Sequence, residues 1–591
     1  MPPLVALAFG LLRCGSDNDD AAGSAERSAG GSAGTGGCFG FGCGNAGNSG
    51  RSGSGGSGGT PPEQEVESSF RSPVATGKYV WAANPESGRV AFIDALSLEV
   101  KTIEARSGPT HLAAVPSSEG NRAIVLNVFS HDATLLAVGA NGDVETFDTE
   151  VHRGANSWAV SANGRWAIAW TDAAAIPNPD PIQGFQDITV IELGARSAES
   201  ARLSVGYRPT RMFVSADEKR AFVVSEPGVS VIELESGNPR VSRDIAVTDD
   251  PLENPASRDV TITPDGAYAL VRRDGSAEVG IVSLVTGERV SVALSGGVTD
   301  LDLSEDGTRA IAVVREPGRT GGDPGAGGGN GGEAGVDAGN DSGVADGAAL
   351  DAADALPDDA DSADAVPPTP ASSEVAILPI PGIFTAPSVF DRVTIHGETV
   401  GSVALAGAGV LLLYTNATPN DRLTIVNARP GAGYLDYRRV ALKAPVQAVF
   451  GAADAEHAIA LLKPAAGSTR AGAFAVVPLS RELPPKIQGT DAPPLSVAIA
   501  GTPSRRAILT VRDDVRRTHG VYLIRMPELQ VDLLGLASPP LASGIVQAAE
   551  SGFVAQEHPE GRITLLRLSD GKARTLTGFE LGAKVVDGSK P

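Results

Sequence analysis

Seven histidines are the side chains in this sequence best suited to acid–base or metal chemistry, and their spacing limits what they can do. No two have the separation of metalloprotease ligands, and no Gly-x-Ser-x-Gly nucleophile motif occurs. The sequence therefore assigns no catalytic residue, and we predict neither a bound metal nor a cofactor. The seven are His111, His131, His152, His396, His457, His519 and His558.

Five side chains remain candidates for ligand binding because they fall at, or just before, the inner strands of a repeated β-structure. His111 and His152 are the two histidines in such positions. Trp158 begins an inner strand and is suited to contact a sugar or a peptide, while Arg208 and Arg211 could line a polar channel. For each residue taken alone, a hydrogen-bonded or ion-paired structural role is the favoured interpretation.

A hairpin that recurs four times indicates which elements position these residues. In each copy an apolar strand ends at Ser or Thr, Asn or Asp follows two residues later, and a second strand begins at Ala. The Asx residue suits the positive φ of a tight turn. The Asx positions are 163, 217, 265 and 306, so the units are 41 to 54 residues apart, near the length of a four-stranded propeller blade. The copies are Val160–Ala167, Val214–Ala221, Ile262–Ala269 and Leu303–Ala310.

The first unit resembles the YVTN family of β-propeller repeats. It has the family's Tyr-Val start at Tyr79-Val80, its turn at Asn84–Gly88, its buried strand at Val90–Asp94 and a shortened Gly-Pro step at Ser107–Pro109. The resemblance is clear over residues 79–316 and weaker over 373–587. It implies a propeller of four-stranded blades and no particular chemistry.

We therefore predict an all-β fold, a β-propeller of about ten repeat units, with one large ring favoured over two tandem rings. Because the first unit lacks an inner strand, we expect residues 582–587 to pair beside Tyr79–Ala83, so that N- and C-terminal strands close the ring. Inner strands of the other units are expected near residues 111, 158, 211, 259, 299, 402, 446, 495 and 544.

An acidic segment interrupts the repeats and divides the propeller into a first part, 73–316, and a second part, 373–591. The insertion, 317–372, contains eleven acids and no bases between Gly321 and Pro370, so we predict that it is disordered. The insertion lies within one blade, where it joins the second strand, Ala310–Val314, to the third strand, Glu374–Leu378. Its closely spaced aspartates lack EF-hand spacing, so a solvated loop is favoured over a calcium site. They are Asp358, Asp359, Asp361 and Asp364.

The N-terminus resembles a bacterial lipoprotein signal. Residues 1–14 contain an apolar run, Leu4–Leu12, that ends just before Cys14, the residue that is lipidated in such proteins. Arg13 departs from the small residue expected there, and no basic residue precedes the run. Residues 15–72 form a Gly/Ser-rich tether, which lipidation would explain. We expect a periplasmic or surface-exposed envelope lipoprotein, or otherwise a secreted protein, held to a membrane through a lipid anchor alone.

Two further cysteines in the tether, Cys38 and Cys43, are placed to form a disulfide outside the cytoplasm, and a metal site is the weaker alternative. The net charge of −23 argues against a nucleic-acid partner and against adsorption to an anionic membrane. We therefore favour a non-catalytic binding or scaffold module whose partner is a protein, a peptide or an envelope polymer. The alternatives are a lactonase-like or dehydrogenase-like enzyme with its site at the central channel, and a purely structural surface protein.

Overall fold

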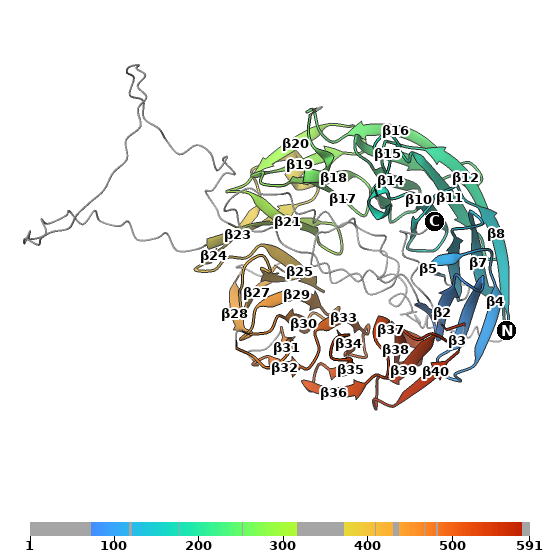
Figure 1. Ribbon diagram of the computed structural model, residues 1–591. Helices are drawn as coiled ribbons and strands as arrows, with labels where there is room; N and C mark the ends of the chain where they lie inside the picture. Colours follow the sequence, from blue (N-terminus) through green and yellow to red (C-terminus); the bar gives the residue numbers. More distant parts are fainter. Residues whose placement is uncertain are drawn as a thin grey trace, which may run out of the picture.

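In the described part of the chain, forty strands form ten four-stranded antiparallel sheets that follow one another around a single ring, a ten-bladed β-propeller (Figure 1). This computed structural model describes residues 73–117, 121–176, 178–250, 252–315, 372–407, 409–428, 436–465, 467–479, 483–578 and 580–581. The first strands of neighbouring blades contact one another around the centre, and the fourth strands lie at the rim. The prediction of one large ring is confirmed.

Blades 1 to 5 occupy the N-terminal half of the ring. Blade 1 contains β1 (Val74–Thr76), β2 (Tyr79–Asn84), β3 (Arg89–Asp94) and β4 (Val100–Glu104). Blade 2 contains β5 (Pro109–Val115), β6 (Arg122–Asn127), β7 (Asp132–Val138) and β8 (Val144–Glu150). Blade 3 contains β9 (Ser157–Val160), β10 (Trp166–Trp170), β11 (Asp187–Leu193) and β12 (Ala198–Ser204). Blade 4 contains β13 (Arg211–Val214), β14 (Arg220–Val224), β15 (Gly228–Glu233) and β16 (Arg240–Ala246). Blade 5 contains β17 (Arg258–Ile262), β18 (Tyr268–Arg273), β19 (Glu278–Ser283) and β20 (Arg289–Ala293).

Blades 6 to 10 complete the ring. Blade 6 contains β21 (Val298–Leu303), β22 (Arg309–Val314), β23 (Ser372–Pro379) and β24 (Asp391–His396). Blade 7 contains β25 (Ser402–Ala406), β26 (Val410–Tyr414), β27 (Arg422–Asn427) and β28 (Tyr437–Ala441). Blade 8 contains β29 (Val446–Gly451), β30 (His457–Leu462), β31 (Gly472–Pro478) and β32 (Lys486–Thr490). Blade 9 contains β33 (Pro494–Ile499), β34 (Arg506–Asp513), β35 (Thr518–Arg525) and β36 (Gln530–Gly535). Blade 10 contains β37 (Pro540–Val546), β38 (Ser551–Gln556), β39 (Arg562–Arg567) and β40 (Ala573–Thr577).

Helical structure in the described residues is limited to single turns in the loops. These are η2 (Ala173–Ala175), η3 (Pro255–Ser257), α1 (Gly382–Thr385) and η4 (Gln547–Ala549). None of the helices in that part of the chain has the length and apolarity needed to cross a membrane.

The pattern of apolar residues explains the order of strands within a blade. Second and third strands are apolar along their length because a neighbouring blade covers each face, as in the fully buried β10 and β26. Fourth strands alternate between partly buried and exposed positions because one of their faces is turned to water, as in β12. All nine inner strands predicted from the sequence are confirmed by the observed first strands of blades 2 to 10.

Apolar packing between blades supplies the core, and it continues across the junction between the last blade and the first. Every pair of adjacent blades shares a cluster of buried side chains. At the junction of blades 10 and 1, Val80 and Ile93 pack with Phe553 and Leu565. Ring closure therefore rests on side-chain packing between two complete sheets.

The prediction that residues 582–587 supply the inner strand of blade 1 is wrong. That edge of β2 is already paired with β1, in the register Val74 to Trp81 and Thr76 to Tyr79. Residues 582–587 themselves lie outside the described residues. Just before them, the C-terminal segment reaches blade 1 through Glu580, whose carboxylate accepts a hydrogen bond from Ser87 Oγ at 2.7 Å and pairs with Arg89 Nη1 at 3.3 Å.

The strands that flank the acidic insertion pair as the sequence predicted. β22 and β23 are adjacent in blade 6, with Val313 opposite Val375 and Ala310 opposite Leu378. The insertion therefore joins the second and third strands of one blade, which keeps its four-stranded form.

Candidate functional site

The loops of the ring divide between two faces. In each blade, the turn from first to second strand and the turn from third to fourth strand lie at one end of the sheet, because consecutive strands are antiparallel. We call this end the hairpin face. The loops from second to third strand, and the links to the next blade, lie on the opposite face, which we call the link face.

His152 lies in the link between blades 2 and 3 and is buried, with 3% of its surface exposed. Its ring Nδ1 is 2.9 Å from Thr189 Oγ1, and its Nε2 is 3.3 Å from Thr171 Oγ1. The Thr171 hydroxyl donates to the carbonyl of Gly154, so its oxygen is left to accept from Nε2–H. Burial lowers the pKa of His152 to about 4, which keeps the imidazole neutral. This geometry gives His152 a structural role between two strands of blade 3.

The other predicted binding residues lie at separate places. His111 is buried in β5, and Trp158 packs within the core shared by blades 2 to 4. Arg211, at the start of β13, pairs with Asp259 of β17 at 2.6 Å and so joins the inner strands of blades 4 and 5. Arg208 lies on the link face and donates to the carbonyls of Asp180 and Gln183. The five residues therefore lie on separate strands and links of blades 2 to 4, and Cys14 lies outside the described residues.

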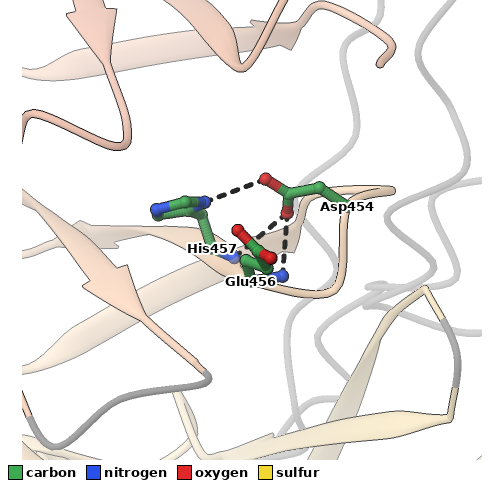
Figure 2. Close-up of side chains that lie close together, drawn as sticks. All are labelled: Asp454, Glu456 and His457. Atoms are coloured by element: carbon green, nitrogen blue, oxygen red, sulfur yellow. Dashed lines mark hydrogen bonds and ion pairs between the residues drawn. The ribbon is translucent and has the colours of Figure 1, made fainter. Parts of the chain in front are cut away.

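A cluster of ionisable side chains that the sequence did not single out lies in the first turn of blade 8 (Figure 2). Asp454 Oδ2 is 2.9 Å from Nδ1 of His457, and its Oδ1 accepts backbone hydrogen bonds from Glu456 and His457. Burial would raise the pKa of Asp454, but these hydrogen bonds outweigh it and hold the pKa below its usual value. One ligand atom from each of the three side chains lies within 4.8 Å of the others.

The surroundings of this cluster favour a structural role over a metal site. Arg505, from blade 9, pairs with Glu456 at 3.0 Å and lies 3.9 Å from Asp454 Oδ2. A guanidinium at that distance supplies the positive charge that a cation would bring. Asp454 also occupies the same turn position as Asp217, which accepts a hydrogen bond from Ser215 Oγ at 2.7 Å.

Blade 8 carries Ala452 where the recurring hairpins of blades 3 to 6 carry Ser or Thr, and His457 replaces the missing hydroxyl. In blade 4, the hydroxyl of Ser215 donates to Asp217 and accepts from the backbone of Arg220. In blade 8 the imidazole of His457 contacts the carboxylate instead, and the carboxylate accepts the equivalent backbone N–H. The sequence carried part of the signal for this turn, since Asp454 lies two residues after Ala452 as Asp217 does after Ser215, but Ala452 departs from the Ser or Thr of the recurring hairpin.

A polar groove of about 470 Å³ lies on the hairpin face where blades 2, 3 and 4 meet. A site of this volume falls in the range of small-molecule and peptide-side-chain pockets. Its lining combines two arginines, two glutamates and three serines with backbone of the tight turns. The lining residues are Ser117, Arg122, Asn163, Gly164, Arg165, Glu192, Leu193, Gly194, Ala195, Ser197, Glu199 and Ser236.

Charged side chains hold the floor of the groove in place. Arg122 is buried, and its guanidinium donates to the carbonyls of Gly194 at 2.7 Å and Gly164 at 3.2 Å, which joins blade 2 to blade 3. Gly164 has a φ of +65°, and a Cβ there would meet the carbonyl oxygen of Pro116 at 1.9 Å. This position therefore requires glycine for the close approach of two turns.

The wall of the groove carries a second set of fixed charges. Glu192 accepts hydrogen bonds from Arg165 at 3.1 Å, from Ser236 Oγ at 2.9 Å and from the backbone of Gly237, which joins blade 3 to blade 4. Burial would raise the pKa of Glu192, and these three donors together hold it below its usual value. Glu199 lies opposite Glu192 on the neighbouring strand and is exposed. The groove therefore presents both signs of charge and several hydroxyls to a ligand.

Comparisons with known proteins identify no family for the chain. No family model and no curated protein matches the sequence. A solved structure described as a eukaryotic initiation factor has 12% identity and a TM-score of 0.45 over 80% of this chain and 97% of its own. Dihydro-heme d1 dehydrogenase NirN has 13% identity and a TM-score of 0.36, over 81% of this chain and 76% of its own.

A third similar structure is apo AztD from Citrobacter koseri, with 8% identity and a TM-score of 0.36 over 76% of this chain and 92% of its own. At TM-scores of 0.45 or less, these similarities carry no argument about function. The fold assignment rests on the ten sheets themselves.

Proposed function

We propose that the protein is a non-catalytic binding module that holds a polar segment of a peptide or an envelope polymer in the groove on the hairpin face. The observation that carries this proposal is the groove itself, which is built by turns from three blades and lined by groups that can both donate and accept hydrogen bonds. A polar chain has alternating donors and acceptors, so it can satisfy such a lining along its length.

The fixed geometry of the lining supports binding over a passive surface role. Arg122 and Glu192 are held by bonds within the protein, so a ligand does not have to order them. Preorganised groups reduce the entropic cost of association. The Asp454–His457 pair could take part in acid–base chemistry, but its part in the blade 8 turn accounts for it, so we do not propose an enzyme.

The proposal includes a location at the cell envelope, supported by the apolar segment that precedes Cys14 and by the Gly/Ser-rich tether after it. Replacing Cys14 by Ala should release the protein from the membrane fraction. Unchanged membrane retention would contradict the lipoprotein assignment.

Arrays of short peptides and of bacterial-type glycans, screened with the whole chain, test the binding function. Ligands found in this way are then titrated by calorimetry against Ala195→Trp, which adds an indole to an exposed turn at the groove. We expect the variant to weaken binding at least about tenfold because it fills the space that the ligand needs. Thr286→Trp, on the equivalent exposed turn of blade 5, is the matched control and should bind as the wild type does.

Two results would contradict the proposal. One is equal binding of the same ligand by the wild type and by Ala195→Trp. The other is no binding of any peptide or glycan to the wild-type chain.

A further inference from the structure

The link face carries the same exposed turn twice, once in blade 3 and once in the link between blades 4 and 5. The sequence Asp-Pro-aliphatic occurs at Asp180–Ile182, between β10 and β11, and again at Asp250–Leu252, between β16 and β17. In both, the aspartate Oδ1 accepts the backbone N–H of the aliphatic residue at 2.9 Å. In both, the aspartate carbonyl also accepts a hydrogen bond from the backbone N–H of the residue after the aliphatic one, Gln183 or Glu253. The side chain of Ile182 is 86% exposed and that of Leu252 is 90% exposed.

Hydrogen bonds from the link between blades 3 and 4 hold the first turn in place. Tyr207 donates from its hydroxyl to the carbonyl of Pro181 at 2.8 Å. Arg208 donates from its side chain to the carbonyls of Asp180 at 3.1 Å and Gln183 at 3.4 Å. This is the role that the structure gives to Arg208. The loop is therefore held in a shape that keeps Ile182 pointing out of the protein surface.

The second turn is locked in a similar way by blade 5. Glu253, next to Leu252, pairs with Arg258 at 3.3 Å and with Arg273 at 3.0 Å. The pair with Arg258 is largely withdrawn from solvent, with side-chain exposures of 4% for Arg258 and 10% for Glu253, whereas Arg273 is 29% exposed. Breaking a pair of this kind is costly because it leaves a buried charge, so the loop cannot readily fold Leu252 inward.

A chain of contacts connects the two turns into one platform. Arg208 pairs with the carboxylate of Glu226 at 3.7 Å, and the backbone N–H of Glu226 donates to the carbonyl of Tyr207. On its other side, the backbone carbonyl of Glu226 accepts from Arg258. The loop from Ser225 to Gly228 thus lies between the two locked turns and fixes one relative to the other.

The charges exposed beside the two aliphatic side chains are mainly acidic. Asp180 and Asp250 are exposed there, and Asp249 is exposed but pairs with Arg289. Arg208 and Arg258 are directed into the protein by their bonds. An acidic fringe is repelled by an anionic lipid surface and attracted to a basic one. Rigid aliphatic side chains with a charged fringe are typical of protein-binding anchors.

We propose that Ile182 and Leu252, with the acids beside them, form a two-anchor surface that binds a folded protein whose apolar pockets are bordered by Lys and Arg. Exposing two large aliphatic side chains on locked turns is unfavourable in the free protein and becomes favourable once both are buried in a partner. The surface lies on the opposite face from the polar groove, so this inference does not depend on the proposed function of that groove.

A photo-crosslinking amino acid, benzoylphenylalanine, placed at positions 182, 252 and 515 of the whole chain tests the proposal in the producing cell. Val515 is the matched control, because it is 95% exposed on the link face of blade 9 but lies outside the two-anchor surface. We expect positions 182 and 252 to trap the same protein and position 515 not to trap it. That protein is then identified by mass spectrometry and purified.

Affinity measurements with the purified partner complete the test. Ile182→Ser and Leu252→Ser should each raise Kd at least about tenfold, whereas Val515→Ser should change it less than about twofold. Asp180→Asn keeps the turn hydrogen bond and removes the charge, so it should weaken the salt dependence of Kd with a smaller loss of affinity. Thermal unfolding should be unchanged in the three serine variants, since all three side chains are exposed.

Several results would overturn the proposal. They are no adduct from position 182 or 252, the same adduct from position 515, adducts only with lipid or with another copy of this chain, and an unchanged Kd in Ile182→Ser or Leu252→Ser.

Discussion

Protonation of His152 should make the stability of the propeller depend on pH between about 7 and 4. The ring of this histidine is enclosed by Thr189 and Thr171, and burial lowers its pKa from 6.5 to about 4. In the unfolded chain the imidazole regains its ordinary pKa, so the unfolded state binds more protons between these two values. Stability therefore rises with pH across that window, is complete above about pH 7, and falls as the pH drops toward 4.

The size of the effect follows from the two pKa values. At pH 7.5 the imidazole is neutral in both states, and at pH 4.5 it is protonated mainly in the unfolded state. The difference in proton binding corresponds to about 2 to 3 kcal/mol of unfolding free energy lost between these two pH values. That amount is a large part of the stability of a typical domain, so it should be measurable.

Urea unfolding followed by tryptophan fluorescence at pH 7.5, 6.0, 5.0 and 4.5 measures the effect, with His152→Gln as the test variant. Glutamine can contact both threonines and carries no charge, so the stability of the variant should fall less with decreasing pH than that of the wild type, by about 2 to 3 kcal/mol over this range. His396→Gln, at an exposed position of β24, should keep the wild-type pH dependence because its side chain remains in solvent. Parallel curves for the wild type and His152→Gln would refute the reasoning.

Two further predictions concern the ring junction and the blade 8 turn. Glu580→Gln should lower the unfolding free energy by about 1 kcal/mol in the same urea assay, because it weakens contacts of a largely buried carboxylate with blade 1. Glu104→Gln removes an exposed partner of the same Arg89 and should cost less than about 0.5 kcal/mol. Equal losses would contradict the closing role of Glu580. His457→Ala should lower the unfolding free energy, and adding Ala452→Ser should restore about 1 kcal/mol because a hydroxyl again bonds to Asp454. If the unfolding free energies of the two single variants simply add in the double variant, the hydroxyl and the imidazole are not equivalent.

Much of the fold could be predicted from sequence because each blade repeats a local pattern. Strand ends at Ser or Thr, followed by Asx, located four of the hairpins, and runs of apolar residues located all nine inner strands of blades 2 to 10. The inner strand of blade 1 was missed because β1 contains only three residues, Val74–Thr76, and follows a Gly/Ser-rich segment. Such a short strand has no alternation to reveal it, and its identity depends on pairing with β2.

The site was harder to predict because its residues meet across blades. The residues that line the groove are spread along the sequence from Ser117 to Ser236, and no local spacing indicates that their turns converge. Arg208 was recognised as a loop residue near an inner strand, but its task of holding the Ile182 turn depends on a loop more than twenty residues earlier. For His152 the sequence position suggested ligand binding, but both ring nitrogens contact threonines of the protein itself.

The way in which the ring closes bears on how the chain folds. Every strand pairing joins neighbours in sequence order, so each sheet can form from a contiguous stretch as synthesis proceeds from the N-terminus. The contacts of Glu580 with Asn84 and Ser87 join residues 496 and 493 positions apart. Those contacts, with the packing of Val80 and Ile93 against Phe553, become available only when the final sheet is complete. The ring should therefore assemble as a row of sheets with two open ends, and it should gain the cooperativity of a closed structure in its last step.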